Sequence, residues 1–168
     1  MQKGSGFRLN RFAQGNIVLL RKVAVSRKGR TMYDLERFIS AQEETYKIAL
    51  QEIQAGHKAS HWMWFVFPQL KELGFSSTAK YYGLSGKGEA KAYIAHPVLG
   101  KRLMEITNAL LKLESNDAEE VMGYPDNLKL QSCMTLFAMV SEESLFRFVL
   151  NKFYDGKMDE KTMSILGS

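Results

Sequence analysis

The chain has 168 residues, 45% of them apolar, which suffices for one continuous hydrophobic core and leaves little material for a second domain. Its only cysteine, Cys133, excludes a disulfide framework and indicates a reduced thiol in a cytoplasmic protein. The net charge of +5 is concentrated at the front: residues 1–32 hold eight Lys or Arg and no acidic residue, whereas residues 33–168 hold fifteen basic against eighteen acidic residues. Nucleic-acid binding is therefore not expected of the body of the chain.

The basic leader at residues 1–32 admits three interpretations: a targeting peptide, a nucleic-acid-binding arm, or a translated stretch upstream of a true start at Met32. We favour the third, because Met32 immediately precedes the first strongly patterned helix. An arginine-rich, acid-free segment also resembles an organellar transit peptide, so that alternative stays open. The apolar stretch at residues 17–20 is too short to cross a membrane, and we expect the leader to be disordered.

From Asp34 onward the sequence predicts helices. Asp34 is a good N-cap and Gly56 a good stop for one long amphipathic helix. The aromatic run at residues 60–68 is expected to form a buried helical turn that ends before Pro68. The remaining predicted helices cover residues 76 or 77 to 82, 89–95, 97–113, 117–122, 126–140 and 145–154, with a last piece from Asp159. The predicted fold is all-α, a single irregular multi-helix domain over residues 33–168, and no segment is apolar enough to enter a membrane.

Four ordered motifs within residues 34–166 carry a resemblance to a known family. They are Asp34-Leu35-x-Arg37-Phe38-x-x-Ala41-Gln42, Ser60-His61-Trp62-Met63-Trp64-Phe65-x-Phe67-Pro68-Gln69-Leu70, His96-Pro97-x-Leu99-Gly100-x-Arg102-Leu103, and Pro125-Asp126-x-x-Lys129-Leu130-x-Ser132-x-Met134-Thr135-Leu136-Phe137. On these motifs the chain resembles the bacterial and fungal family numbered eighteen-ten among the domains of unknown function. The resemblance implies an all-α domain and no activity. Members have been labelled calpastatin-like, but that inhibitor is a disordered chain, whereas this body is patterned to fold alone.

Three familiar kinds of catalytic or binding motif fail on inspection. His57 and His61 are four residues apart, but two imidazoles do not make a zinc site, and Gly56 breaks the helix just before them. The glycine-rich stretch at residues 83–88 lacks the first glycine and the final Ser or Thr of a phosphate-binding loop, so a flexible turn is the better interpretation. Cys133 has no nucleophile signature around it. The sequence therefore predicts neither a metal nor a cofactor.

The segment from Lys58 to Gln69 is the strongest candidate for a site, because it combines cationic, imidazole and amide side chains with four aromatic rings. One interpretation is structural, with the aromatic rings in the core and His61 bonded to a backbone carbonyl. The other is a pocket in which an indole stacks on a ligand and His61 is the acid or base. A second polar set, spaced by three on the helix at residues 126–140, raises the same question, since Asp126 and Lys129 are also a plausible helical ion pair.

We therefore expect a small-molecule pocket between residues 58–69 and the helix at 126–140, with His61 as the candidate catalytic residue. The candidate ligand-binding residues are Lys58, Trp62, Trp64, Gln69, Asp126, Lys129 and Ser132. Cation, hydroxyl and indole together suit an anionic small molecule, namely a nucleotide or a phosphorylated metabolite. The alternative is a non-catalytic module that binds a protein partner through exposed aromatic side chains.

Overall fold

The computed structural model describes residues 32–167, so the predictions made for the leader lie outside the described residues. Within that range the chain forms nine α-helices and one 3-10 turn, and its one β-bridge joins Leu70 to Leu84. The elements are α2 (Glu36–Gln54), α3 (Met63–Val66), η1 (Lys71–Leu73), α4 (Ser77–Tyr82), α5 (Lys87–Ala95), α6 (Leu99–Leu111), α7 (Ala118–Met122), α8 (Asp126–Val140), α9 (Leu145–Tyr154) and α10 (Glu160–Gly167). The all-α prediction is confirmed.

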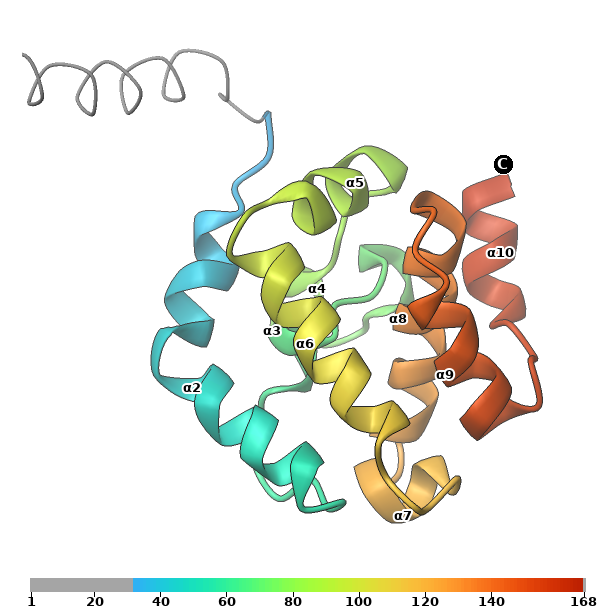
Figure 1. The fold of residues 1–168 in the computed structure, drawn as a ribbon. Coiled ribbons are helices and arrows are strands. Elements are labelled where there is room, and N and C mark those ends of the chain that lie inside the picture. Colours follow the sequence, from blue (N-terminus) through green and yellow to red (C-terminus); the bar gives the residue numbers. More distant parts are fainter. Residues whose placement is uncertain (1–31, 168) are drawn as a thin grey trace, which may run out of the picture. The chain divides into compact units, whose positions relative to one another are not determined.

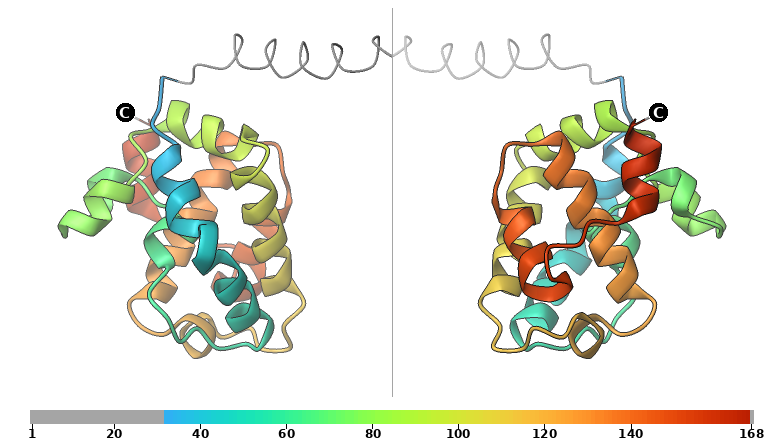
Figure 2. Two further views of the ribbon diagram at one scale, coloured as in Figure 1. Left: turned by 90° about the vertical axis from the view of Figure 1, so that its left-hand side faces the viewer. Right: turned by 90° about the vertical axis from the view of Figure 1, so that its right-hand side faces the viewer.

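The helices pack around α8, which is apolar on nearly all sides. Figure 1 shows α2, α6 and α9 running across the molecule with α6 between the other two, and α8 behind α6 and α9. Helix α5 contacts both α6 and α8, and α10 covers the outer side of α8, as the two side views in Figure 2 also show. The short helices α3 and α4 lie behind α6, where α3 also packs against α2. A helix without a polar face is stable only when other elements surround it, which explains the central place of α8.

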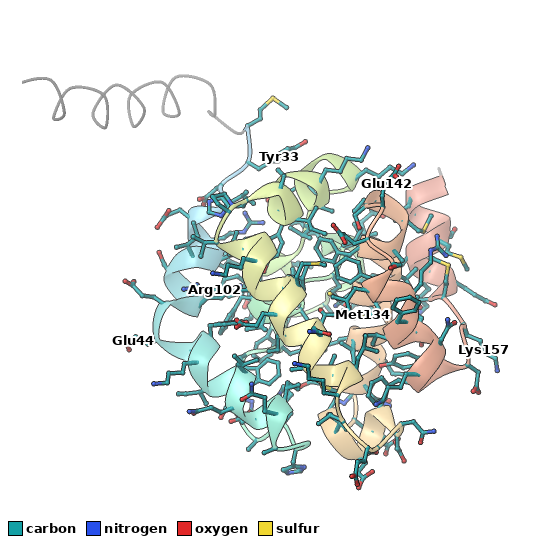
Figure 3. The ribbon with its side chains drawn as sticks, viewed as in Figure 1. Tyr33, Glu44, Arg102, Met134, Glu142 and Lys157 are labelled. Atoms are coloured by element: carbon teal, nitrogen blue, oxygen red, sulfur yellow. The ribbon has the colours of Figure 1, made fainter. Side chains whose placement is uncertain are left out.

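Large aromatic and aliphatic side chains fill the space between these helices. Trp62, Phe38, Tyr93 and Phe137 are completely buried, and the rings of Tyr93 and Phe137 are 5.7 Å apart. In Figure 3 the side chain of Met134 lies in the interior between α6, α8 and α9, whereas Glu44 and Lys157 point away from the helices. Cys133 is also fully buried, and burial raises the pKa of its thiol well above the ordinary value.

Most predicted helix ends are confirmed, and four are corrected. Asp34 does not cap α2: the N-cap is Leu35, without a side-chain hydrogen bond. Helix α6 begins at Leu99 rather than Pro97 and ends at Leu111 rather than Leu113. Helix α5 begins at Lys87 rather than Glu89, so the turn after Gly83 is shorter than predicted. In contrast, Asp117 accepts hydrogen bonds from two backbone N–H groups of α7, as its spacing predicts.

None of the helices formed by residues 32–167 is both long enough and apolar enough to cross a membrane.

Candidate functional site

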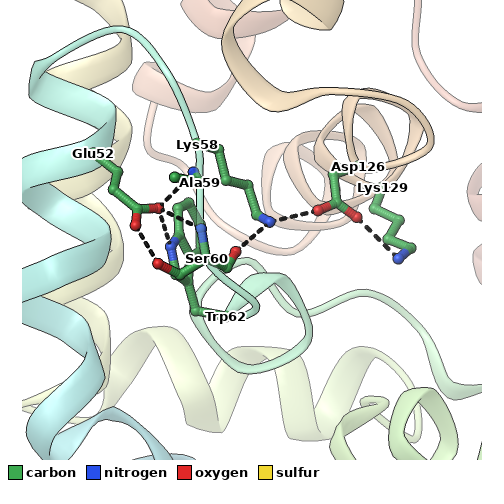
Figure 4. A network of polar contacts seen from close by, with 7 residues as sticks. All are labelled: Glu52, Lys58, Ala59, Ser60, Trp62, Asp126 and Lys129. Atoms are coloured by element: carbon green, nitrogen blue, oxygen red, sulfur yellow. Dashed lines mark hydrogen bonds and ion pairs between the residues drawn. The ribbon is translucent and has the colours of Figure 1, made fainter.

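The Glu52 carboxylate fixes the start of residues 58–69, the aromatic segment. Glu52 lies on α2 and accepts hydrogen bonds from the backbone N–H groups of Ala59 and Ser60, at 2.9 and 3.0 Å, from the Ser60 hydroxyl, and from the Trp62 indole N–H at 2.7 Å. Figure 4 shows these bonds converging on the one carboxylate. They hold the chain that leads from α2 into α3, so the position of α3 depends on Glu52.

The same hydrogen bonds control the protonation of Glu52. Burial raises the pKa of a carboxyl group, but the bonds from Ser60, Ala59 and Trp62 favour the charged form more strongly, and they lower the pKa of Glu52 to about 2. Glu52 is therefore a permanent anion at neutral pH. All of its hydrogen-bond partners belong to the chain between α2 and α3. Glu52 therefore holds this chain in place and does not serve as an acid or base.

A bridge of three charged residues joins the aromatic segment to α8. The Lys58 ammonium lies 2.7 Å from one oxygen of Asp126, and the Lys129 ammonium lies 3.0 Å from the other (Figure 4). Burial raises the pKa of the Asp126 carboxyl, but the hydrogen bonds from Lys58 and Lys129 outweigh burial, so that pKa lies below its ordinary value. Two cations thus share one carboxylate, and the bridge carries a net charge of +1.

The two lysines of this bridge differ in surroundings. The Lys58 side chain is only 7% exposed, donates a further hydrogen bond to the Ser60 carbonyl at 2.6 Å and lies over the Trp62 ring. The Lys129 side chain is 26% exposed, and its ammonium makes no hydrogen bond in the described part of the chain other than that to Asp126. It lies 5.2 Å from the centre of the Trp64 ring. The surplus positive charge is therefore carried by Lys129.

Trp64 and Lys129 line a narrow crevice between α3, α4 and α8. Its other lining residues are Met63, Phe67, Gln69, Ala79, Tyr82 and Gly83. The enclosed volume is about 10 Å³, room for roughly one water molecule. The crevice gathers three of the predicted ligand-binding residues: Trp64, Gln69 and Lys129.

One wall of this crevice depends on a close approach between two backbone segments. The Leu84 N–H donates to the Gln69 carbonyl at 2.9 Å, and the Lys71 N–H donates to the Leu84 carbonyl at 2.8 Å. A Cβ atom on Gly83 would lie 2.4 Å from the Cα of Lys71, so only glycine allows this approach. Gly83 therefore serves the wall of the crevice in addition to ending α4.

The structure separates the other predicted site residues from this crevice. Trp62 is fully buried in the core, with its indole N–H on Glu52, so it does not form a wall of the crevice. The Ser132 hydroxyl lies 3.2 Å from both the Leu128 carbonyl and the Asp159 carboxylate, where it ties α8 to the start of α10. His61 is exposed, and its imidazole makes no hydrogen bond or ion pair in residues 32–167.

Metal-binding groups do not gather anywhere in the described range. No cluster of three or more His, Cys, Asp or Glu side chains in residues 32–167 has the geometry to hold a metal ion. A larger hollow of about 510 Å³ lies between α2 and α6, but it is open, and the carboxylate of Glu105 beside it already accepts a hydrogen bond from Tyr46. The crevice at Trp64 is thus the place where the predicted site residues meet.

The arrangement of motifs and helices has counterparts among known proteins. A family model described as "Protein of unknown function (DUF1810)" matches residues 32–166. This chain belongs to that family. The chain is similar to the crystal structure of the conserved hypothetical protein Rv1873 from Mycobacterium tuberculosis, which is 44% identical, with a TM-score of 0.81 over 82% of this chain and 99% of that one. Among curated proteins, none matches the sequence.

Two groups of residues in this DUF1810 chain were not singled out from the sequence. Gln42 is buried and donates to the Phe65 carbonyl at 2.6 Å and to the Tyr93 hydroxyl at 2.9 Å, while Arg102 donates to its side-chain oxygen at 3.4 Å. This core network holds the far end of α3. Tyr82 lines the crevice directly. The signal for Gln42 was its presence on the apolar face of a helix, where an amide requires buried partners.

Proposed function

We propose that this protein binds an anionic small molecule, a nucleotide or a phosphorylated metabolite, at the crevice formed by Trp64, Gln69 and Lys129. The observation that carries the proposal is the sharing of Asp126 by two lysines, because it leaves Lys129 as a partly exposed surplus cation beside an indole. Phosphate groups are bound by charge-assisted hydrogen bonds of this kind, and nucleobases stack on aromatic rings.

Lys129 can exchange its partner at low cost. If its ammonium turns from Asp126 toward a ligand, Asp126 keeps the buried ion pair with Lys58 at 2.7 Å. No uncompensated charge is then left in the protein, which is the usual penalty for breaking a partly buried pair. Replacing Asp126 by an anionic ligand as the partner of Lys129 therefore changes the free energy little, before any further contact with the ligand is counted.

The size of the crevice limits how the ligand lies. A drug-sized ligand needs several hundred Å³, far more than the crevice encloses. The ligand would therefore insert only an edge, with the anionic group outside on Lys129 and the remaining atoms against Trp64. Because the Lys129 ammonium is 5.2 Å from the centre of the Trp64 ring, one ligand can reach both.

His61 remains the candidate acid or base in this proposal. It lies three residues before Trp64, is exposed, and has no structural partner among residues 32–167 that would occupy its imidazole. An imidazole without an internal partner is free to donate a proton to a ligand or to accept one from it.

Melting curves with and without ligand provide the test. We would measure wild type, Lys129→Met and Lys161→Met with inorganic phosphate, ribose 5-phosphate and the four nucleoside monophosphates. Lys161 is an exposed lysine of α10 without an ion pair in the described residues, so it controls for the loss of one surface charge. A ligand at one hundred times its Kd stabilises the folded state by about 2.7 kcal/mol. We expect a shift in wild type and Lys161→Met, and none in Lys129→Met.

Two results would contradict this proposal. If none of these anions shifts the melting temperature of wild type, the crevice does not bind this class of ligand. If Lys129→Met and Lys161→Met lose the shift equally, the effect comes from net charge and not from the crevice.

A second candidate function rests on a different observation, the exposure of two aromatic side chains near α4. Phe75 is 93% exposed and Tyr81 is 57% exposed, whereas the rings of the core are buried. Exposed aromatic residues are enriched where proteins bind one another. Here Phe75 would anchor a protein partner without catalysis. Analytical ultracentrifugation of wild type and Phe75→Ser tests self-association, the simplest form of this alternative: a concentration-dependent dimer that the variant loses would support it.

A further inference from the structure

The crevice contains two polar side chains that the protein itself leaves without hydrogen bonds. Gln69 and Tyr82 are both partly buried, and neither the Gln69 amide nor the Tyr82 hydroxyl has a hydrogen-bond partner in residues 32–167. Elsewhere the buried amide of Gln42 and the hydroxyl of Tyr93 bond to each other. Polar side chains that line one crevice without internal partners are free to bond to water or to a ligand.

The backbone of Gln69 is fixed beside the crevice. Gln69 follows the buried Pro68, and its carbonyl accepts the Leu84 N–H in the bridge described above. Tyr82 is held by the rings of Phe65 and Phe38, at 5.2 and 5.9 Å. Burial raises the pKa of the Tyr82 hydroxyl, with a smaller contribution from Tyr81, so at neutral pH it is a hydrogen-bond donor. The crevice is therefore lined by the amide of a residue whose backbone is fixed and by the phenol of a ring that two other rings hold.

We infer that Gln69 reads the edge of a nucleobase, so that the ligand of the crevice is a nucleotide rather than a sugar phosphate or a simple anion. The inference rests on the proposed anion site at Lys129. An amide presents a donor and an acceptor side by side, which pairs with the adjacent donor and acceptor on a base edge, as glutamine does with adenine. Only an edge fits the crevice, and a base whose edge enters it lies beside Trp64.

The charge of the body favours a free nucleotide over a nucleic-acid chain. Residues 33–168 carry fifteen basic and eighteen acidic side chains, so a polyanion gains little from this surface. A single phosphate needs only the one surplus cation, Lys129. Titration with a single-stranded oligonucleotide tests whether the crevice prefers a free nucleotide or a nucleotide within a chain.

Titration calorimetry of the full chain with ribose 5-phosphate, AMP, GMP, CMP and UMP tests the inference. We expect at least one nucleoside monophosphate to bind about tenfold or more tightly than ribose 5-phosphate. In Gln69→Leu the nucleoside monophosphates should bind no more tightly than ribose 5-phosphate binds to the same variant, and Gln69→Glu should lower the preference by replacing the donor with an acceptor. Gln51→Leu, at an exposed glutamine of α2, is the matched control and should behave as wild type.

The outcomes separate this inference from the function on which it rests. If ribose 5-phosphate and every nucleotide bind equally, and Lys129→Met abolishes all of them, the anion site stands and base recognition by Gln69 is wrong. Retention of the base preference in both Gln69 variants would overturn the inference in the same way. If no phosphate compound binds, the proposed function itself fails. Tighter binding of an oligonucleotide than of any monophosphate would contradict a free nucleotide as the ligand.

Discussion

The two ends of the aromatic segment, residues 58–69, lie beside polar groups that differ in how many hydrogen-bond partners the protein provides. At its start, Glu52 accepts four hydrogen bonds, and Trp62 is buried against it. At its end, the Gln69 amide has no partner in residues 32–167, and Lys129 shares its only carboxylate with Lys58. The polar groups at the start of the segment therefore have their hydrogen-bond partners within the protein, whereas the Gln69 amide at its end does not.

This contrast teaches which polar groups serve architecture. A buried polar group without a partner costs free energy, so a protein that folds stably satisfies the groups that hold its helices together. Groups that stay unsatisfied near the surface are paired with water until a ligand replaces it. By this criterion the Glu52 cluster positions α3, and the crevice at Trp64 is the surface at which we propose that a ligand binds.

The largest difference is expected between the two tryptophans. Trp62→Ala removes a completely buried indole and should cost about 3–5 kcal/mol of unfolding free energy. Trp64→Ala removes a partly buried ring at the crevice and should cost about 1–2 kcal/mol, while abolishing nucleotide binding. Urea denaturation measures both. Equal costs for the two variants would show that Trp64 is a core residue like Trp62.

The next effect is a pH dependence that comes from Glu52. Because the folded-state pKa of Glu52 is about 2, below its ordinary value of 4.5, its stabilising contribution is complete above pH 4.5 and is lost as the pH falls toward 2. We expect this loss to be about 2 kcal/mol after allowing for solvent screening. Denaturation of wild type and Glu52→Gln between pH 5 and 2.5 should show a steeper decline in wild type. Parallel curves would mean that Glu52 is an ordinary surface carboxylate.

Because Lys58 and Lys129 share the Asp126 carboxylate, we expect a substitution of Lys58, which lies outside the crevice, to change anion binding. Lys58→Met leaves Lys129 as the only cation of Asp126, which should tighten that pair and weaken anion binding several-fold. The variant should also lose about 1–2 kcal/mol of stability, because the Ser60 carbonyl loses its donor. Calorimetry and urea denaturation measure the two effects. Unchanged affinity would show that Lys129 does not need to leave Asp126.

The smallest effect is expected for His61. His61→Ala should change the unfolding free energy by less than about 0.5 kcal/mol, since the imidazole is exposed and has no partner in the described chain. Nucleotide binding should persist, and any turnover of a bound substrate should be lost. A cost above 1 kcal/mol in thermal or chemical denaturation would instead support the structural interpretation, in which His61 satisfies a backbone group.

Local patterns in the sequence were sufficient for most of the fold. Helix α9 and helix α8 begin and end where their apolar spacing and their stop signals predict, and α4 has Ser76 as its cap and Gly83 at its end. The ion pair of Asp126 with Lys129 was also readable, because residues three apart on a helix are neighbours. These features depend on residues that are close along the chain.

Only the tertiary structure decided which polar residues meet across the fold. The sequence gives no sign that Lys58 reaches Asp126, that Glu52 binds the Trp62 indole, or that Tyr82 joins Gln69 at one crevice. It also could not show that Ser132, on the same helix as Lys129, faces Asp159 and α10. Periodicity determines which face of a helix is buried, whereas the partner of each polar group is set by the packing of helices far apart in the chain.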